Sequence, residues 1–356
     1  MLILNKMNFI AFVKKYKQYF IAVLLIVVLI LVGKFISTVD FRQLGMYLSR
    51  MPGMFAGVVI ASLFAYLAPT YAWQLIMGEE RKKVRFVDLF MIKHVGEMLT
   101  AFNPTGIIAG ESVKAVYLHK RGVDARQGLS SIIMLRILII LSGIFLAVIS
   151  GVYLIVVKAG DSSNLLYILI AVALIIFLSY LLTVFLLNPK LYLGKTVENI
   201  KRKTNWSFIT DKIVSSSYEI NQLSADFFAA NKIRFTIAFL LCVSQWIFGS
   251  LEFYIILQML GLDISMVDAV AVEMGVIFFR TIGAIVPGQI GIEEYGNKVM
   301  LDAIGVESNE IWLIATLMRR GRQVFWLGIA GIFMIFISKT TNIKLKGNDG
   351  STLRNS

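Results

Sequence analysis

NPTGIIAGES, at residues 103–112, recurs in outline 183 residues later as VPGQIGIEE, at residues 286–294. In both stretches a proline is followed by glycines and then by a glutamate. The same offset pairs two glycine-valine turns and two arginines: Gly122-Val123 with Gly305-Val306, and Arg136 with Arg319. Internal duplication of this kind is typical of membrane transport folds, whose binding site lies where the repeats meet. A chance match is the alternative, because a search over many offsets also finds coincidences.

Composition indicates a membrane protein. Hydrophobic residues make up 58% of the chain and the mean hydropathy is +0.77, values typical of a multi-span helical protein. Lys and Arg number 35 against 22 acids, but they lie in short loops between apolar runs, so they indicate membrane topology and not a nucleic-acid partner. The basic N-terminus opens an apolar run without a cleavage site, which predicts an uncleaved first span. Cys242 is alone, which excludes an intramolecular disulfide.

Six apolar runs are long enough to cross a bilayer at about 20 residues for each span. They are residues 20–36, 54–77, 129–157, 165–187, 235–260 and 310–338. Two further apolar segments, 86–121 and 266–304, are interrupted by Pro104 and Pro287, and each is predicted to form a re-entrant helical hairpin. The sequence therefore predicts an all-α, polytopic membrane protein with about six full spans and two hairpins.

Lysine and arginine collect in cytoplasmic loops, so their distribution predicts the orientation of each segment. Both connections of the first hairpin, 78–85 and 114–126, are rich in basic residues. The flanks of the second hairpin, 261–268 and 298–310, carry only Lys298. Three spans separate the hairpins, so the two should enter the membrane from opposite faces. We therefore expect an inverted-topology repeat with both termini in the cytoplasm.

This organisation predicts a single integral membrane domain over residues 1–340, followed by a short polar cytoplasmic tail over 341–356. The repeat halves lie at about 54–157 and 235–338, and an amphipathic cytoplasmic connection covers 190–234. An alternative treats 266–286 as a full span, because its 21 residues are long enough to cross. That alternative places the acidic 298–310 loop in the cytoplasm and the basic tail outside.

Irregular backbone at membrane depth persists only where protein or a water-filled cavity surrounds it, so both hairpin tips predict a central polar cavity. The residues that should form and gate these tips are Pro104, Gly106, Gly110, Pro287, Gly288 and Gly291. Each second half-helix should direct its positive N-terminal end toward the bilayer interior, where N–H groups can hold an anion. Glu111 and Glu294 follow directly, either as helix caps that the dipole favours or as a pH- or cation-sensitive gate.

Ionisable residues inside spans are costly and are therefore functional candidates. Three arginines interrupt the last span, and the 16 residues that follow them, 323–338, give only about 24 Å of helix. At least one of these arginines should therefore lie at membrane depth. Arg136 lies either at depth or at the interface, because the uncharged run 137–157 can span alone.

If the repeat holds, Arg136 and Arg319 face one cavity, and guanidinium groups match phosphate through paired hydrogen bonds. A phosphate-bearing lipid head group is the predicted ligand, and its predicted site comprises Glu111, Lys114, Arg136, Glu294, Arg319, Arg320 and Arg322. No catalytic residue, metal or cofactor is predicted.

Other residues have no assigned role. Lys93 and Glu97 form an i,i+4 pair, which either neutralises charge in a buried helix or relays protons. Glu252, Glu273 and Arg280 are further cavity candidates. In the connection, apolar residues at helical spacing predict a helix on the membrane surface or a cytoplasmic packing helix: Ile213, Ile220, Leu223 and Phe227.

These motifs resemble the lysylphosphatidylglycerol synthase transmembrane-region family of flippase-like membrane proteins. The resemblance rests on NPTGIIAGESVKAVYLHKRG at 103–122, on VPGQIGIEEYG at 286–296 and on arginines at 136 and 319, and it covers roughly residues 15–340. It carries over Pro104, Gly110, Glu111, Lys114, Pro287, Gly288, Gly291 and Glu294. It implies a protein that moves a polar lipid between leaflets. The best-known members add a soluble aminoacyl transferase domain, which we do not expect here, so glycolipid or isoprenoid-linked substrates stay open.

The leading hypothesis is therefore a plasma-membrane lipid transporter that is not an enzyme. One alternative is a membrane-embedded transferase acting on lipid-linked substrates, although no Asp-x-Asp, His-Glu-x-x-His or phosphate-binding loop occurs. Another is a non-transporting scaffold for enzymes of envelope lipid or glycan synthesis. Expected partners are the bilayer, an anionic or phosphate-bearing lipid and such enzymes.

Overall fold

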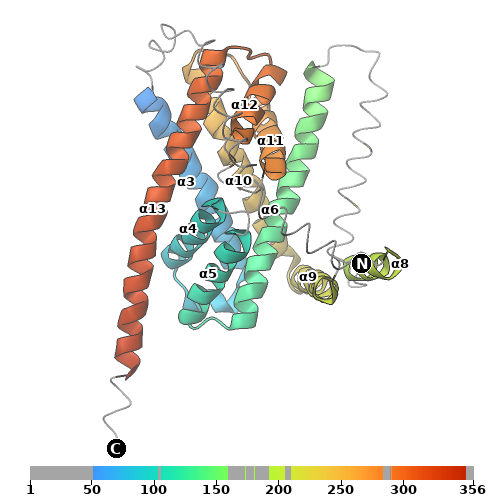
Figure 1. Ribbon diagram of the computed structural model, residues 1–356, viewed down its shortest axis with the longest axis vertical. Coiled ribbons are helices and arrows are strands. Elements are labelled where there is room, and N and C mark those ends of the chain that lie inside the picture. The colour runs from blue at the N-terminus through green and yellow to red at the C-terminus, as the bar shows by residue number, and fades with distance from the viewer. Residues whose placement is uncertain are drawn as a thin grey trace, which may run out of the picture.

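The computed structural model describes residues 51–102, 106–158, 192–204, 210–283 and 291–349, together with Ala173, Tyr180 and Gln289. Within these residues every secondary-structure element is a helix (Figure 1). The first part contains α3 (Met51–Ile76), a 3-10 turn (Gly78–Lys83), α4 (Phe86–Phe102), α5 (Gly106–Lys120) and α6 (Ala125–Tyr153), which ends in a π turn (Leu154–Lys158). The connection holds α8 (Tyr192–Thr204) and α9 (Asp211–Ala230). The last part contains α10 (Lys232–Met259), α11 (Met266–Ile282), α12 (Ile292–Ala303) and α13 (Asn309–Asp349).

Four helices are long and apolar enough to cross a membrane. They are Pro52–Ile76, Ala125–Val156, Lys232–Met259 and Asn309–Ile337, which confirms the apolar helices predicted at 54–77, 129–157, 235–260 and 310–338. The predicted span 20–36 and nearly all of 165–187 lie outside the described residues. The helix α13 continues to Asp349, so the first part of the predicted polar tail is helical.

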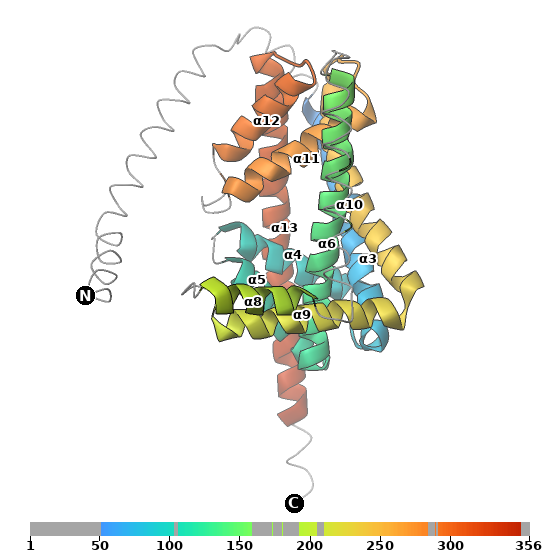
Figure 2. The ribbon, with the colours of Figure 1, turned by 90° about the vertical axis from the view of Figure 1, so that its right-hand side faces the viewer.

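Two pairs of shorter helices lie between these long ones. α4 packs on α5, and α11 packs on α12. In each pair the two helices are separated near the position of the proline that interrupts the apolar segment, Pro104 or Pro287. Figures 1 and 2 show the α4–α5 pair toward one end of the long helices and the α11–α12 pair toward the other. α11 has 17 residues, about 25 Å of helix, which is shorter than the roughly 30 Å hydrocarbon core.

Helix contacts in the first part have counterparts in the last part. The helices α3 and α10 pack on each other, α4 contacts α13, and α11 contacts α6. Contacts of α5 with α6 correspond to those of α12 with α13, and contacts of α3 with α6 correspond to those of α10 with α13. The connecting helices α8 and α9 pack together at about the same level along the long helices as the α4–α5 pair, and α9 contacts α6 and α10 (Figure 2). α9 therefore packs against two of the long helices.

The two glycine-valine turns have the same geometry. Gly122 and Gly305 have φ angles of 86° and 88°, a left-handed conformation that glycine adopts without penalty. The Val123 N–H donates to the Leu118 carbonyl at 3.2 Å, and the Val306 N–H donates to the Leu301 carbonyl at 3.0 Å. These bonds satisfy carbonyl groups at the ends of α5 and α12. A third turn of this kind, at Gly261, ends α10, so the motif is not restricted to the repeat.

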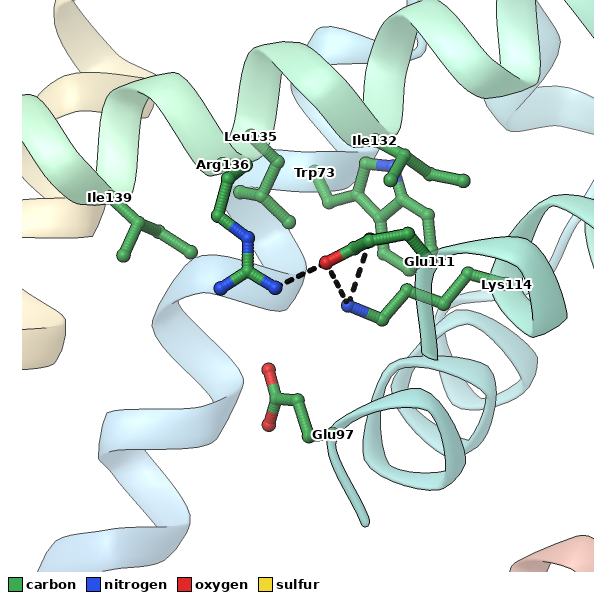
Figure 3. Close-up of a pocket in the computed structure, with 8 residues that line it drawn as sticks. All are labelled: Trp73, Glu97, Glu111, Lys114, Ile132, Leu135, Arg136 and Ile139. Atoms are coloured by element: carbon green, nitrogen blue, oxygen red, sulfur yellow. Dashed lines mark hydrogen bonds and ion pairs between the residues drawn. The ribbon is translucent and has the colours of Figure 1, made fainter. Parts of the chain in front are cut away.

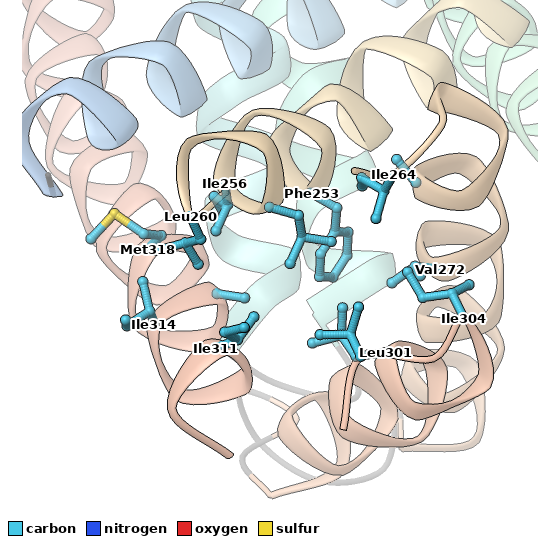
Figure 4. Packing of buried hydrophobic residues seen from close by; sticks show 14 of the residues in the cluster. Phe253, Ile256, Leu260, Ile264, Val272, Leu301, Ile304, Ile311, Ile314 and Met318 are labelled. Carbon is cyan, nitrogen blue, oxygen red and sulfur yellow. The ribbon is translucent and has the colours of Figure 1, made fainter. Parts of the chain in front are cut away.

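Each end of the helix bundle has its own apolar core. One cluster joins α10, α11, α12 and α13, with Met54 and Val58 from α3 packed into it (Figure 4). The other joins α3, α4, α5 and α6, with Ala238 and Cys242 from α10 and Ile337 from α13. Because α3, α10 and α13 contribute to both clusters, the cores are connected through these helices.

Glycines set the distance between α4 and α5. A Cβ atom added to Gly110 would lie 2.3 Å from the Gly96 carbonyl oxygen and 2.4 Å from the Thr100 hydroxyl. A Cβ added to Gly96 would lie 2.4 Å from Cε of Lys114. Any larger residue must therefore push the two helices apart and displace Lys114.

We predict that Gly110→Ala destabilises the fold by about 1–3 kcal/mol, because overpacking against backbone atoms cannot be relieved by a side-chain rotation. The free energy of unfolding in detergent micelles measures this effect. The matched control is Gly328→Ala in α13, where a new Cβ meets nothing within 4 Å and removal of a helical glycine should stabilise by about 0.5–1 kcal/mol. Equal stability of the two variants would contradict the predicted close contact.

Candidate functional site

The first group of charged residues, here called the first cluster, connects α4, α5 and α6. Its members are Lys93, Glu97, Glu111, Lys114 and Arg136. On the α5–α6 side, Nη2 of Arg136 donates to Glu111, and Nζ of Lys114 lies 3.3 Å from the same carboxylate (Figure 3). On α4, Nζ of Lys93 pairs with Glu97 at 2.6 Å, as the i,i+4 spacing predicts.

Exposure differs among the members of the first cluster. The side chains of Arg136 and Glu97 are 40% and 34% exposed, that of Glu111 is 20% exposed, and those of Lys114 and Lys93 are 6% and 2% exposed. Arg136 is therefore the most exposed member, whereas Lys93 and Lys114 are buried. With three basic and two acidic members, the cluster has one positive charge in excess.

A small pocket lies at the centre of the first cluster. Figure 3 shows Arg136, Lys114, Glu111 and Glu97 around it, together with an apolar wall of Trp73, Ile132, Leu135 and Ile139. The cavity measures about 10 Å³, enough for about one water molecule. The ion pairs of Glu111 therefore close the pocket, and a phosphate enters only if these side chains move.

The second group, here called the second cluster, connects α10, α11, α12 and α13. Its members are Glu252, Glu273, Glu293, Glu294, Arg319, Arg320, Arg322 and Gln323. Arg319 is 1% exposed; its Nη1 pairs with Glu273 at 2.5 Å and its Nη2 lies 3.8 Å from Glu293. Its guanidinium also stacks at 4.3 Å on the Phe253 ring. This arginine is enclosed in protein, which fits the prediction that an arginine of this span lies at depth.

Arg320 joins the two neighbouring acids at the start of α12. Its Nη2 lies 2.6 Å from Oε1 of Glu294, and its Nη1 lies 3.3 Å from Glu293. Gln323 donates to both oxygens of Glu293 at 3.1 Å. Glu294 also accepts the Gly291 N–H at 2.7 Å, so it caps α12 and pairs with arginine at once.

Tyr66 on α3 lies between the clusters. Its hydroxyl accepts from Nη1 of Arg322 at 3.4 Å, and Nζ of Lys93 lies 5.4 Å from the centre of its ring. Arg322 in turn lies 3.2 Å from Glu252. The charged groups of the two halves are therefore in contact through one aromatic side chain.

The structure places the seven predicted head-group residues in both clusters. Glu111, Lys114 and Arg136 meet in the first, and Glu294, Arg319, Arg320 and Arg322 meet in the second. We expected Arg136 and Arg319 to face one cavity, but the pocket that Arg136 lines does not include Arg319. The repeat also equates Arg319 with Arg136, yet the arginine that pairs with Glu294 is Arg320.

The predicted hairpin tips are only partly described. Pro104, Pro287 and Gly288 lie outside the described residues. Gly106 begins α5, Gly110 contacts Gly96, and Gly291 precedes α12. The sequence alone assigned no role to Tyr66 or Gln323. The only sequence feature that could have identified them is that each is a polar residue inside a predicted span.

Comparison with known proteins gives one family. A family model described as the lysylphosphatidylglycerol synthase transmembrane region matches residues 19–331. A UPF0104 membrane protein of Pyrococcus horikoshii is 26% identical over 248 residues, which is 66% of this chain and 72% of that protein. No solved structure matches the chain.

We predict that Arg319→Met destabilises the protein by about 3–5 kcal/mol, because it leaves Glu273 as an unpaired buried charge. The control is Lys298→Met, which breaks a partly exposed 3.3 Å pair with Asp302 on α12 and should cost about 0–1 kcal/mol. Chemical denaturation of both variants in detergent measures the difference. Similar losses would show that the Arg319 pair does not stabilise the fold as a buried pair should.

Proposed function

Because the chain belongs to the lysylphosphatidylglycerol synthase transmembrane-region family, we propose that this membrane protein moves a polar, phosphate-bearing lipid between the leaflets of the plasma membrane. The observation that carries the proposal is the pair of arginine-carboxylate clusters, in which arginines of the candidate spans α6 and α13 pair with acids of the short helices between the spans. Charges in such segments are costly and typically line a substrate path.

The first cluster is the proposed entry site for the head group. Arg136 is half exposed and is held by Glu111, while Lys114 lies beside the same carboxylate. A phosphate offers the same acceptor geometry to guanidinium as a carboxylate does, so it can replace Glu111 at Arg136. The excess positive charge of this cluster favours an anionic guest.

The ion pairs also account for gating. Glu111 on α5 pairs with Arg136 on α6, and Glu294 on α12 pairs with Arg320 on α13. Each pair fastens the second helix of a short-helix pair to the following long helix. A head group that competes for the arginine loosens this attachment and lets the helix move.

An inverted-topology repeat with two re-entrant hairpins is the proposed framework. It is supported by the matching helix contacts of the two parts and by the short helix pairs at opposite ends of the long helices. In this framework both termini are cytoplasmic and the α11–α12 end faces outward. Enzymes that make envelope lipids or glycans are the proposed partners.

Transport, and not group transfer, is the proposed activity. The acids best placed to act as a base, Glu111 and Glu294, are each paired with an arginine. In this arrangement both carboxylates are engaged by arginine and are not presented to a substrate. The same pairing is what a closed transport gate needs.

The topology predicts which cysteines react from outside the cell. Lys298→Cys should be labelled by a membrane-impermeant thiol reagent in intact cells, whereas Lys120→Cys should be labelled only after permeabilisation. The native Cys242 is buried and should not react with the reagent. Labelling of both new cysteines from the same side would rule out the proposed orientation.

Transport is tested with purified protein in lipid vesicles that contain a fluorescent phosphatidylglycerol. Arg136→Ala should slow translocation at least about tenfold, because one lost charge-assisted contact is worth about 1.5–3 kcal/mol. The matched control is Arg126→Ala, an exposed arginine on the first turn of α6, which should translocate at the wild-type rate. Absence of translocation by the wild-type protein for this and other labelled polar lipids would refute the proposed function.

A further inference from the structure

Glu252 is a buried carboxylate whose charge is incompletely satisfied. It lies on α10, is 2% exposed, and its Oε2 is 3.2 Å from Nε of Arg322. Neither of these two atoms takes part in a hydrogen bond. The contact is therefore an ion pair without an aligned donor, a weak arrangement for a charge removed from water.

The neighbouring acids are held more firmly. Glu273 accepts a 2.5 Å hydrogen bond from Arg319. Glu293 accepts two hydrogen bonds from Gln323 and also contacts Arg320 at 3.3 Å. Hydrogen bonds to a carboxylate favour its charged form, and of the three buried acids Glu252 is the one whose ion-paired oxygen accepts none.

Charged groups from three neighbouring helices interact with Glu252. They are Arg319 and Arg322 from α13, Glu273 from α11 and Glu293 from α12, and Arg322 also donates a hydrogen bond to the Tyr66 hydroxyl on α3. The members of the second cluster include four acids, three of them buried, and three arginines. Arg280 on α11, which interacts electrostatically with Glu293, supplies a fourth positive charge. Together with Arg280, the cluster is neutral as folded.

A neutral cluster has no spare charge for an anionic head group. If a phosphate monoanion binds one of its arginines, a carboxylate is displaced and one negative charge is left in excess. Such a charge is strongly unfavourable in a low-dielectric interior, and a buried acid responds by binding a proton. Head-group binding at this cluster therefore requires a counter-ion, and the available one is H⁺.

We propose that Glu252 is a proton-binding site, and that occupation of the second cluster by an anionic lipid head group is coupled to protonation of Glu252. This inference rests on the proposed function and names its coupling ion. The proton binds the carboxylate as the phosphate oxygen replaces it beside Arg322, so the net charge of the cluster does not change. The Arg322 guanidinium keeps its contact with Tyr66 and gains the phosphate. Because the coupling is reciprocal, acidification must strengthen head-group binding.

The experiment is calorimetric titration of the full chain in detergent with dihexanoyl phosphatidylglycerol, a soluble anionic phosphodiester lipid. Titration in two buffers with different ionisation enthalpies gives the number of protons taken up on binding. We expect uptake of about one proton, with affinity rising by up to about tenfold for each pH unit of acidification. Glu252→Gln should bind without proton uptake and without this pH dependence. The control Glu79→Gln, an exposed acid paired with Lys82, should behave as the wild type.

The possible outcomes distinguish failure of the proton site at Glu252 from failure of the proposed transport function. Lipid binding by the wild type without proton uptake overturns the proton site and leaves the proposed function intact, whatever the stability of the variant. Proton uptake that persists in Glu252→Gln overturns the assignment to this residue. In the vesicle assay, translocation that proceeds at the same rate with and without an imposed pH gradient overturns the coupling. If neither binding nor translocation occurs, the proposed function itself fails and the inference with it.

Discussion

A charge enclosed in a membrane helix must have a partner of opposite sign, and this constraint organises the described part of the structure. Arg319 shows it most clearly, because its guanidinium is enclosed by Glu273, Glu293 and the Phe253 ring. The partners come from α10, α11 and α12, so pairing one arginine fixes the position of three helices against α13. Replacing both partners of a buried ion pair by apolar residues often costs no stability, whereas removing one partner leaves an unpaired charge. Their presence therefore fits a role in function better than a role in holding the fold.

Glycines and ion pairs play complementary roles at the short helices. Gly96 and Gly110 let α4 and α5 approach until backbone atoms touch, which brings Lys114 over the pocket. Glu111 then reaches Arg136 on the next long helix. Apolar packing thus determines where the helices lie, whereas the charges determine which of their faces meet.

Much of the fold follows from simple features of the sequence. The helices α3, α6, α10 and α13 are predicted by the length of their apolar runs, and the division between α4 and α5 is predicted by Pro104. The turns at Gly122 and Gly305 follow from the need for a left-handed residue. These features are local, so one sequence suffices to find them.

The charge pairs of the candidate site depend on tertiary packing and could not be predicted in the same way. Neighbouring residues on a helix point about 100° apart, so the rotation of α13 about its own axis decides whether Arg319 or Arg320 meets Glu294. The sequence identifies both arginines as candidates but does not determine this rotation. Tyr66 carries no motif, and its position between the clusters appears only when α3 is packed against α4 and α13.

The length of α13 has a mechanical consequence. The helix runs without a break from Asn309 to Asp349, and Arg319 lies near one end. From Arg319 to the other end is about 45 Å of helix, so a tilt of about 5° at the arginine displaces that end by about 4 Å. A rigid rod pivoting at its charged end would convert an exchange of ion pairs into a displacement large enough for a neighbouring protein or lipid surface to sense.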